Sequence, residues 1–459
     1  MDSEAKAGVL YSSSEVVCQP ATKLYTRRWF ILALFCLYSG TNAFQWIQYS
    51  IISNIITRFY GVEITTTDWL SMVYMLVYIP LIFPATWLLD TRGFRVVAIL
   101  GSSLNALGAL IKIASAEPHL FAVTMLGQTV CSIAQVFILG MPSKVAATWF
   151  GPKEVSTACA IAVFGNQLGV AIGFLLPPQI VPDVDDLEVV AVNLRYMFIG
   201  TAAVTTVLAI LVIIFFKKQP PIAPSLAQAN FLTRQDAKEE SYLQSIKKLV
   251  FRVPSFLLII TYGINTGSFY AISTLLNQEI LDSYPDKIVD AGQIGLSMVV
   301  VGVVGSIVWG IWLDRTRTYK KTTVAVYILT LISMGLYTAT LNLGQLWIVY
   351  VSSSLLGFTM TGYLPIGFEF AAEITYPISE GSSSGLLNAS AQTFGIVFTL
   401  CMGQLIPAVS VLGANIFLCG ALLIGAIVTV TISEDLRRQR ENQRLFDQIK
   451  TEIVGNPST

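Results

Sequence analysis

Charge is what this chain has least of. Of its 459 residues, 12% are Asp, Glu, Lys or Arg and 54% are hydrophobic. A water-soluble chain carries about 25% charged residues, so a soluble globular protein is excluded. The chain also has a single histidine, His119. That excludes a histidine metal cluster and catalysis by paired histidines.

Signatures of catalysis and of ATP use are missing as well. No Gly-rich phosphate loop followed by Lys is present, so ATP is not the expected source of energy. All cysteines except Cys18 lie in apolar stretches, which leaves no disulfide framework. We therefore expect no enzyme activity, no cofactor and no bound metal. An enzyme embedded in the membrane is the most distant alternative.

Long apolar runs are what the chain has in abundance. Twelve of them reach the roughly 20 residues needed to cross the hydrocarbon core of a membrane. They lie near 29–55, 69–89, 96–115, 120–145, 155–180, 196–216, 255–278, 294–313, 322–341, 346–368, 384–406 and 412–433. Lipid offers the backbone no hydrogen-bond partner, so these runs should be helices. The sequence predicts an all-α membrane protein.

Basic residues fall on alternate sides of the predicted spans. Nearly all of them lie in the tails, the central connection and every second loop, whereas the opposite loops hold Arg58, Arg195 and Lys287. This asymmetry predicts that both termini are cytoplasmic. The sequence predicts five parts in chain order: a cytoplasmic tail at 1–28, a six-helix bundle at 29–216, a cytoplasmic loop with an amphipathic helix at 217–253, a second six-helix bundle at 254–433 and a cytoplasmic tail at 434–459.

Short polar segments occur twice in the sequence, about 224 positions apart. Such an internal repeat is typical of a transporter built from two related halves. The loop around Asp90, with Arg92 and Arg95, has its counterpart around Asp314 and Arg315. An Asp at such a place can pair with a helix N-terminus or with an Arg of a neighbouring helix. We therefore interpret these five residues as a cytoplasmic gate.

The predicted spans are poor in charge, which disfavours coupling to protons, because a proton relay needs ionisable groups at membrane depth. Lys112 lies near the outer end of the third span, where its long side chain is expected to reach the interface. Lys144 and Glu369 lie near inner ends.

Neutral polar and aromatic residues occupy the spans instead. Asn42 and Trp46 share one face of the first helix, and Asn265 and Tyr270 occupy the equivalent region of the seventh. Gln135, Gln167 and Gln392 lie in the middle of other spans. Aromatic faces attract a quaternary ammonium, and amides bind a hydroxyl, so this set suits a small organic cation. The alternatives are an interfacial anchor for Trp46 and helix–helix contacts for each Gln.

The loop pattern resembles that of the Major Facilitator Superfamily. Leu88, Asp90, Gly93 and Arg95 match its loop between the second and third helices, with Thr86 in place of a Gly. Gly310, Asp314 and Arg315 match the second-half copy, with Arg317 in place of a Gly. The resemblance implies twelve transmembrane helices in two six-helix bundles.

Longer blocks resemble the feline leukaemia virus subgroup C receptor-related transporters. The matching blocks lie at 42–49, 68–72, 135–140, 149–157, 360–365 and 384–392, within a region of about 28 to 440. The resemblance implies a facilitative carrier of choline and ethanolamine, with a substrate site at Trp46, Tyr270, Gln135 and Gln392 and with Asn42 nearby. Gln167 and Asn265 stay as secondary candidates from the residue pattern.

Three functional hypotheses follow. The first is a plasma-membrane uniporter of choline and ethanolamine that works by alternating access. The second is a haem exporter, which the lone histidine and the charge-poor spans make less suitable, because haem needs an iron ligand and basic partners for its propionates. The third is a receptor or sensor that does not transport. Mitochondrial or endoplasmic reticulum membranes are the alternative locations. The expected partners are the small cation and the lipid bilayer, with no nucleic acid and no obligate protein partner.

Overall fold

The computed structural model describes residues 23–151, 154–224, 242–376, 378 and 380–440. Within these ranges, the side chains of Asp90, Ser156, Asp314, Glu380 and residues 242–246 lie outside the description. Most of the predicted N-terminal tail, the middle of the central loop and the end of the C-terminal tail lie outside the described residues as well. Every regular element that is described is helical.

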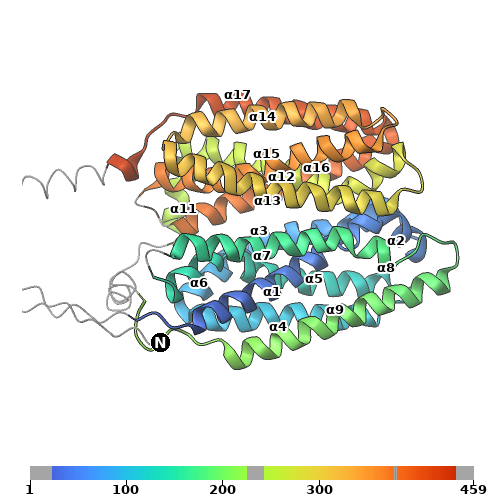
Figure 1. Cartoon of the computed structure of the whole chain (residues 1–459), viewed down its shortest axis with the longest axis horizontal. Coiled ribbons are helices and arrows are strands. Elements are labelled where there is room, and N and C mark those ends of the chain that lie inside the picture. Colours follow the sequence, from blue (N-terminus) through green and yellow to red (C-terminus); the bar gives the residue numbers. More distant parts are fainter. Residues whose placement is uncertain (1–22, 152–153, 225–241, 377, 379, 441–459) are drawn as a thin grey trace, which may run out of the picture. The chain divides into compact units, whose positions relative to one another are not determined.

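The chain divides into two compact units, 1–239 and 240–459. The first unit contains the blue to green helices of Figure 1 and the second the yellow-green to red ones. The helices of the first unit are α1 Arg27–Ile47, the 3-10 helix η1 Ser50–Ile52, α2 Ser53–Tyr60, α3 Ile64–Arg92, α4 Phe94–Ile113, α5 Phe121–Leu139, α6 Pro142–Trp149, α7 Val155–Leu175, α8 Pro177–Ile180 and α9 Leu187–Phe215. Those of the second are α11 Tyr242–Phe251, α12 Val253–Ser283, α13 Ile288–Thr316, α14 Tyr319–Thr340, α15 Leu346–Thr375, α16 Glu380–Ala408 and α17 Val411–Thr431.

Eleven described stretches are long and apolar enough to cross a membrane. The remaining predicted span, 346–368, forms α15, whose 30 residues are sufficient in length. This helix contains three consecutive serines at 352–354 together with Thr359 and Thr361. The described residues thus provide a helix for each of the twelve predicted spans.

Three predicted spans are interrupted rather than continuous, and one of them, the fifth span in chain order, consists of α7 and the short α8. The first span consists of α1, the turn η1 and α2, with the break at Gln48 and Tyr49. The fourth consists of α5 and α6, which begins with Pro142 at its first turn. Proline has no backbone N–H and a fixed φ, so it suits the start of a new helix.

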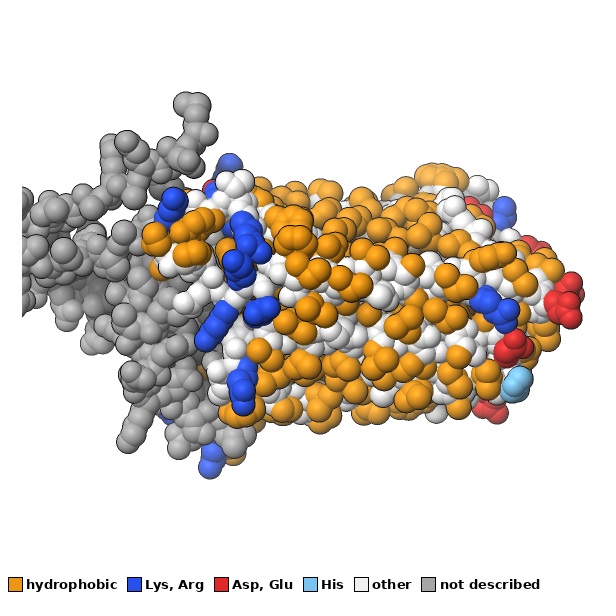
Figure 2. Space-filling model, turned by 90° about the horizontal axis from the view of Figure 1, so that it is seen from below, with side chains coloured by type: hydrophobic (Ala, Val, Ile, Leu, Met, Phe, Trp, Pro, Cys, Tyr) orange, Lys and Arg blue, Asp and Glu red, His pale blue; other side chains and the backbone are white. Residues whose placement is uncertain are grey.

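Hydrophobic side chains cover the middle of the face drawn in Figure 2. Most Lys and Arg side chains on this face gather toward one end, and the Asp and Glu side chains gather at the other. On α9, Val207, Ile210 and Ile214 are half or more exposed. Such a surface is unfavourable in water and suits a surrounding of lipid chains.

Small residues bring helices into close contact within each unit. In the first unit, α1 packs on α7 where Gly40 meets Gly169, and a Cβ built on Gly169 would lie 2.0 Å from the Gly40 carbonyl oxygen. In the second unit, α13 packs on α15, and a Cβ on Gly357 would lie 2.1 Å from the Met298 carbonyl oxygen. Association of membrane helices depends on such packing, because lipid removes the hydrophobic driving force between them.

We expect Gly169→Ala to separate α1 from α7 and to destabilise the first unit by about 1–3 kcal/mol, because the added methyl group meets backbone that cannot turn away. The measurement is the thermal unfolding midpoint of purified protein in detergent. Gly200→Ala in α9 is the matched control, because no atom lies within 4 Å of the position of its added Cβ. An equal midpoint for both variants would contradict this packing.

Candidate functional site

The candidate residues of α1 lie on its buried side, in the last two turns before the helix breaks. Trp46 is 7% exposed and Asn42 is fully buried. The Asn42 amide donates to Asn105 Oδ1 at 2.9 Å and to the Cys131 carbonyl at 3.0 Å. Both donors of Asn42 are thus used inside the first unit, and its Oδ1 is the atom that keeps no partner among the described residues. A substrate contact by Asn42 stays a prediction.

Two glutamines of the first unit keep a free acceptor. Gln135 on α5 is 9% exposed, and Gln167 on α7 is partly buried. The Oε1 atom of each is buried and has no hydrogen-bond partner among the described residues. A buried amide without a partner is uncommon in a folded protein and can be satisfied by a ligand or by water.

Three candidates belong to the second unit. Asn265 on α12 is fully buried, and neither its Nδ2 nor its Oδ1 has a partner among the residues that the structure describes. Tyr270, on the same helix, is partly buried, with its ring centroid 6.4 Å from that of Phe269. Gln392 on α16 is 3% exposed. The candidates therefore come from both units, and their joint use as one substrate site remains a prediction.

Lys112 does not reach the interface, and that expectation was wrong. It is 1% exposed, and its ammonium donates to Gln128 Oε1 at 2.8 Å. The prediction failed because the position of Lys112 near a helix end suggested exposure, whereas tertiary packing against α5 encloses it. Gln128 itself was missed, because one Gln among many in apolar runs gives no distinctive signal.

Glu279 is a buried acid just beyond the end of the predicted seventh span. The predicted seventh span ended at residue 278, but α12 continues to Ser283 and Glu279 is fully buried. The Tyr337 hydroxyl on α14 donates to Glu279 Oε2 at 2.8 Å. Burial of a carboxylate is costly unless it is hydrogen-bonded or neutral, so the Tyr337 contact is important for this helix junction.

The predicted gate residues lie at helix ends in both units. The backbones of Asp90 and Asp314 belong to the last turns of α3 and α13, but their side chains lie outside the described residues. Arg92, Arg95 and Arg315 are exposed. The Arg95 guanidinium lies 3.5 Å from the Ile213 carbonyl oxygen. The gate assignment remains a prediction.

The turn after α13 shares a positive φ with the turn after α3, but not its full backbone conformation. Gly93 follows α3 with φ of 79°, and Arg317 follows α13 with φ of 54°. Both positions are in the left-handed half of conformational space, where glycine is favoured. Because ψ is 170° at Gly93 and 21° at Arg317, the second half has a different turn, in which Arg317 carries some backbone strain.

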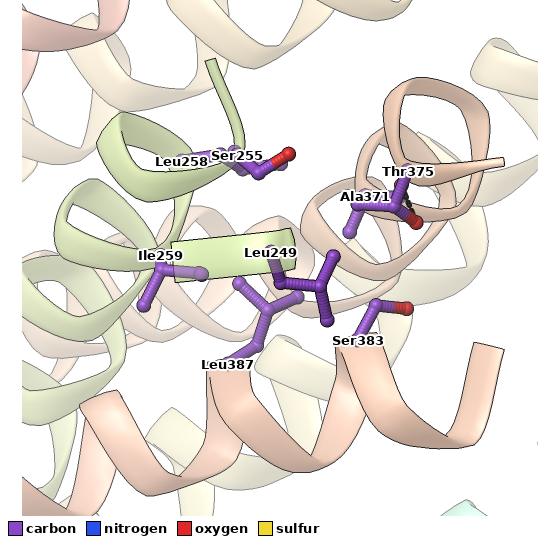
Figure 3. A pocket seen from close by; sticks show the side chains of 8 residues that line it. All are labelled: Leu249, Ser255, Leu258, Ile259, Ala371, Thr375, Ser383 and Leu387. Carbon is purple, nitrogen blue, oxygen red and sulfur yellow. Dashed lines mark hydrogen bonds between the residues drawn. The ribbon is translucent and has the colours of Figure 1, made fainter. Parts of the chain in front are cut away.

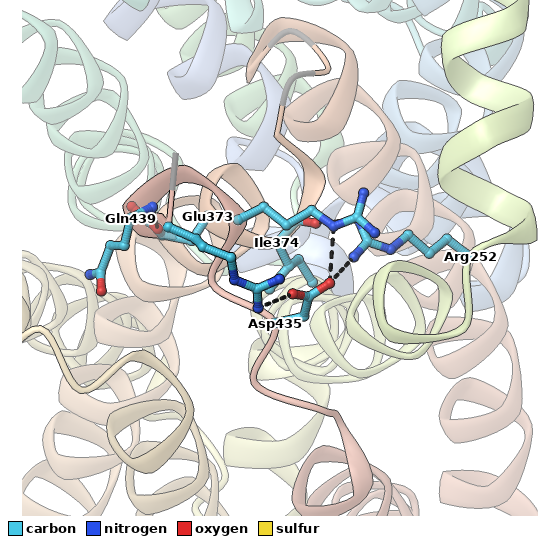
Figure 4. Close-up of polar contacts among 7 residues, drawn as sticks. Arg252, Glu373, Ile374, Asp435 and Gln439 are labelled. Atoms are coloured by element: carbon cyan, nitrogen blue, oxygen red, sulfur yellow. Dashed lines mark hydrogen bonds and ion pairs between the residues drawn. The ribbon is translucent and has the colours of Figure 1, made fainter. Parts of the chain in front are cut away.

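Other charged pairs were missed by the sequence reasoning. In the first unit, the Arg28 guanidinium contacts both carboxylate oxygens of Glu154 at 3.1 Å. In the second unit, Arg252 donates to Asp435 and, at 2.6 Å, to the Ile374 carbonyl at the end of α15 (Figure 4). The Arg28–Glu154 pair is bidentate, so it has defined geometry as well as charge.

Asp435 is the centre of a cluster that holds the segment after α17. Arg437 and Arg440 also donate to it, at 2.9 and 2.7 Å. The hydrogen bond from Arg437, together with the charges of Arg252 and Arg440, holds the pKa of Asp435 below its ordinary value. Nearby, the Gln439 backbone N–H donates to Glu373 at 3.3 Å. We call this group of contacts the tail clamp.

A small recess in the second unit is not suited to a cation. It lies where Leu249 of α11 meets α12, α15 and α16, beside Leu258 and Leu387 (Figure 3). Its described polar groups are hydroxyls such as that of Thr375, which donates to the Ala371 carbonyl of its own helix. No predicted site residue lines this recess, and its lining has neither a charged nor an aromatic side chain.

Comparison with known proteins gives strong matches to membrane transporters. The family model described as Major Facilitator Superfamily matches residues 30–400. The Choline/ethanolamine transporter FLVCR1 of Felis catus is 59% identical over 424 residues, which cover 92% of this chain and 76% of that protein. The Choline/ethanolamine transporter FLVCR2 of Homo sapiens is 54% identical over 427 residues, which cover 93% and 81%.

Solved structures agree in fold. A bacterial homolog of the human lysosomal transporter Spinster, inward-facing and unoccupied, matches with a TM-score of 0.67 at 14% identity, over 91% of this chain and 99% of that one. The transporter FucP in the outward conformation matches with a TM-score of 0.60 at 15% identity, over 89% and 100%. At such low identity these matches show the fold and not the substrate.

The tail clamp should depend on pH. Because the pKa of Asp435 is lowered in the folded protein, its contribution is complete above the ordinary pKa of an Asp and is lost as pH falls through the lowered value. We expect amides in 433–440 of the wild type to be protected from hydrogen exchange at neutral pH and to lose this protection in acid. Asp435→Asn should lack it throughout, whereas Glu434→Gln, which removes a neighbouring exposed acid, should not. Unchanged protection in Asp435→Asn would refute the clamp.

The Glu279 junction can be tested by removing its donor. We expect Tyr337→Phe to lower the free energy of unfolding by about 1–2 kcal/mol, because the buried carboxyl group loses its hydrogen bond. Glu279→Gln should be tolerated, since a side-chain amide oxygen can accept the same bond. Thermal unfolding in detergent measures both. The control is Tyr196→Phe on α9, where the side chain is 67% exposed. No difference between the two Tyr variants would contradict a stabilising role.

Proposed function

Because this chain belongs to the feline leukaemia virus subgroup C receptor-related transporters of the Major Facilitator Superfamily, we propose that it carries choline, and ethanolamine as well, across a membrane. It is a membrane transporter and not an enzyme. The named relatives are choline/ethanolamine transporters, and the identity extends over more than nine-tenths of this chain. Haem remains an alternative substrate to be tested in the same assay.

The observation that carries the proposal is the chemistry of the unsatisfied polar groups. Among the predicted site residues, several buried amide atoms have no hydrogen-bond partner among the residues that the structure describes; they belong to Asn42, Gln135, Gln167 and Asn265. Neutral amides can bind the hydroxyl of choline or the ammonium of ethanolamine without placing a competing fixed charge beside the substrate. Such groups provide no iron ligand and no basic partner for haem propionates.

The cation itself would be held by aromatic rings. Trp46 is proposed as one wall and Tyr270 as another, since the faces of these rings attract a quaternary ammonium by about 2 kcal/mol when water is excluded. Gln392, like Gln135, would line the site, with Asn42 close to Trp46. Two unlike rings from the two related halves would give the site the asymmetry that a molecule with one cationic end requires.

Transport would proceed by rocking of the two halves, with the loops of Asp90 and Asp314 as the cytoplasmic gate and both termini in the cytoplasm. A monovalent cation that enters along the membrane potential gains roughly 2.3 kcal/mol per 100 mV. That gain is sufficient for uniport at the plasma membrane without a coupling ion. The clustering of Lys and Arg in the tails and the central loop supports this orientation.

We expect Trp46→Ala to abolish saturable choline uptake and to weaken choline binding roughly 30-fold, the equivalent of about 2 kcal/mol. Trp46→Phe should retain part of both, because it keeps an aromatic face. The measurements are uptake of labelled choline and ethanolamine into reconstituted vesicles, with haemin as a parallel arm, and a thermal-shift titration.

The control for loss of a tryptophan is Trp347→Ala, since Trp347 is 65% exposed at the start of α15. Wild-type uptake by Trp46→Ala at equal abundance in the vesicles would refute the site. Haemin flux without choline flux would refute the substrate. Binding of choline without flux would favour a receptor over a carrier.

A further inference from the structure

The break in the first membrane span creates a need for hydrogen-bond partners inside the first unit. The helical bonds of α1 end with Gln48 N–H donating to the Phe44 carbonyl at 3.0 Å, and the chain continues into η1 and α2. The last carbonyls of a helix have no partner within it. At membrane depth, water is not at hand to replace that partner, so the carbonyl of Gln45 requires a donor from another helix.

Gln128 of α5 supplies that donor. Its Nε2 donates to the Gln45 carbonyl at 3.1 Å and to the Leu70 carbonyl of α3 at 2.9 Å. Its Oε1 accepts from the Lys112 ammonium of α4 at 2.8 Å and from the Tyr74 hydroxyl of α3 at 3.5 Å. An amide offers two donors and two acceptor sites. All four are used, and the side chain of Gln128 connects four helices.

Lys112 fixes the direction of the Gln128 amide. An ammonium can only donate, so the amide must present its oxygen to Lys112 and its NH₂ group to the two carbonyls. Lys112 is 1% exposed, and its Nζ also lies 5.8 Å from the ring centroid of Tyr49, which belongs to the same break. The Tyr49 hydroxyl shares a hydrogen bond of 2.6 Å with Thr124 of α5. The buried ammonium of Lys112 therefore lies next to two side chains at the break. Gln128 binds the Gln45 carbonyl, and Tyr49 binds Thr124.

The side chain of Gln45 is held as well as its carbonyl. Gln45 Nε2 donates to Asn105 Oδ1 of α4 at 2.8 Å, and Asn42, one turn earlier, donates to the same oxygen. Trp46 is the next residue in the chain and follows directly from this anchored backbone. A shift of the Gln45 carbonyl would turn the last turn of α1 and with it the Trp46 ring.

We infer that Gln128, oriented by Lys112, is a positioning residue that sets the place of Trp46 and thereby the affinity for the transported cation. This inference rests on the proposed function of Trp46. Neither Gln128 nor Lys112 is required to touch the substrate. Their contribution should therefore be found in the apparent affinity and not in the maximal rate.

Gln128→Glu is the sharpest test, because it keeps an oxygen for Lys112 and removes both donors, placing carboxylate oxygen against the Gln45 and Leu70 carbonyls. We expect KM for choline to rise roughly fivefold to tenfold, with Vmax per transporter nearly unchanged. Lys112→Met should raise KM in the same direction, because the amide is then free to turn. Thr129→Val is the control. It is the next residue of α5, and its hydroxyl donates to the Met125 carbonyl of its own helix.

A second readout does not depend on the substrate. Protein labelled with 5-fluorotryptophan gives a fluorine resonance for Trp46, which is assigned by its loss in Trp46→Phe. We expect this resonance to shift or broaden in Gln128→Glu and Lys112→Met and to be unchanged in Thr129→Val. It also remains readable if a variant transports poorly.

The outcomes distinguish the positioning role of Gln128 from the proposed transport of choline. A moved Trp46 resonance together with a raised KM supports the inference. An unmoved resonance, or equal losses of Vmax and affinity that follow a lowered unfolding midpoint, overturns it in favour of a purely structural role. If the wild type neither binds nor carries choline, the proposed function fails, while the resonance still decides whether Gln128 positions Trp46.

Discussion

Pairing of backbone groups away from water is the constraint on which this structure depends. Most of the chain satisfies it by forming long helices, since every interior N–H and C=O is then paired within the helix. Where a helix stops inside a span, a side chain has to complete the pairing. At the end of α1 that side chain is Gln128, whose NH₂ group serves the carbonyls of Gln45 and Leu70. The packing of the first unit therefore provides the hydrogen bonds that the interruption of α1 requires.

The same constraint explains where buried charge is tolerated. Lys112 and Glu279 are both enclosed, but each meets a neutral hydrogen-bonding group: Gln128 for the ammonium and the Tyr337 hydroxyl for the carboxyl group. Neither forms an ion pair among the described residues. Neutral partners avoid the desolvation of a second charge, and they fix the orientation of the groups that they contact. Both contacts join helices of the same unit.

The internal repeat is visible in chemistry as well as in fold. Arg28 precedes the membrane part of the first unit and contacts Glu154, and Arg252 precedes that of the second and contacts Asp435. The turn after α3 has Gly93 where the turn after α13 has Arg317, and both adopt a positive φ. An Arg therefore anchors the start of the first long helix of each unit, α1 and α12, but with an acid from a different place in the chain. The proposed aromatic walls, Trp46 and Tyr270, also differ, because related halves can diverge in their side chains.

The sequence alone determined the class of protein and the main helices. Apolar runs of spanning length, a low content of charge and the doubled Asp loops require a helical membrane protein of two halves, because lipid permits few other arrangements. It also indicated Trp46, Tyr270 and the amides, since residue type suffices to name groups that attract a cation. Only the tertiary structure decided that Lys112 is enclosed, that Glu279 is buried beyond the predicted span and that Gln128 completes the end of α1. These facts depend on contacts between residues far apart in the chain, such as Gln45 and Gln128, and hydrophobic periodicity contains no information about which helices meet.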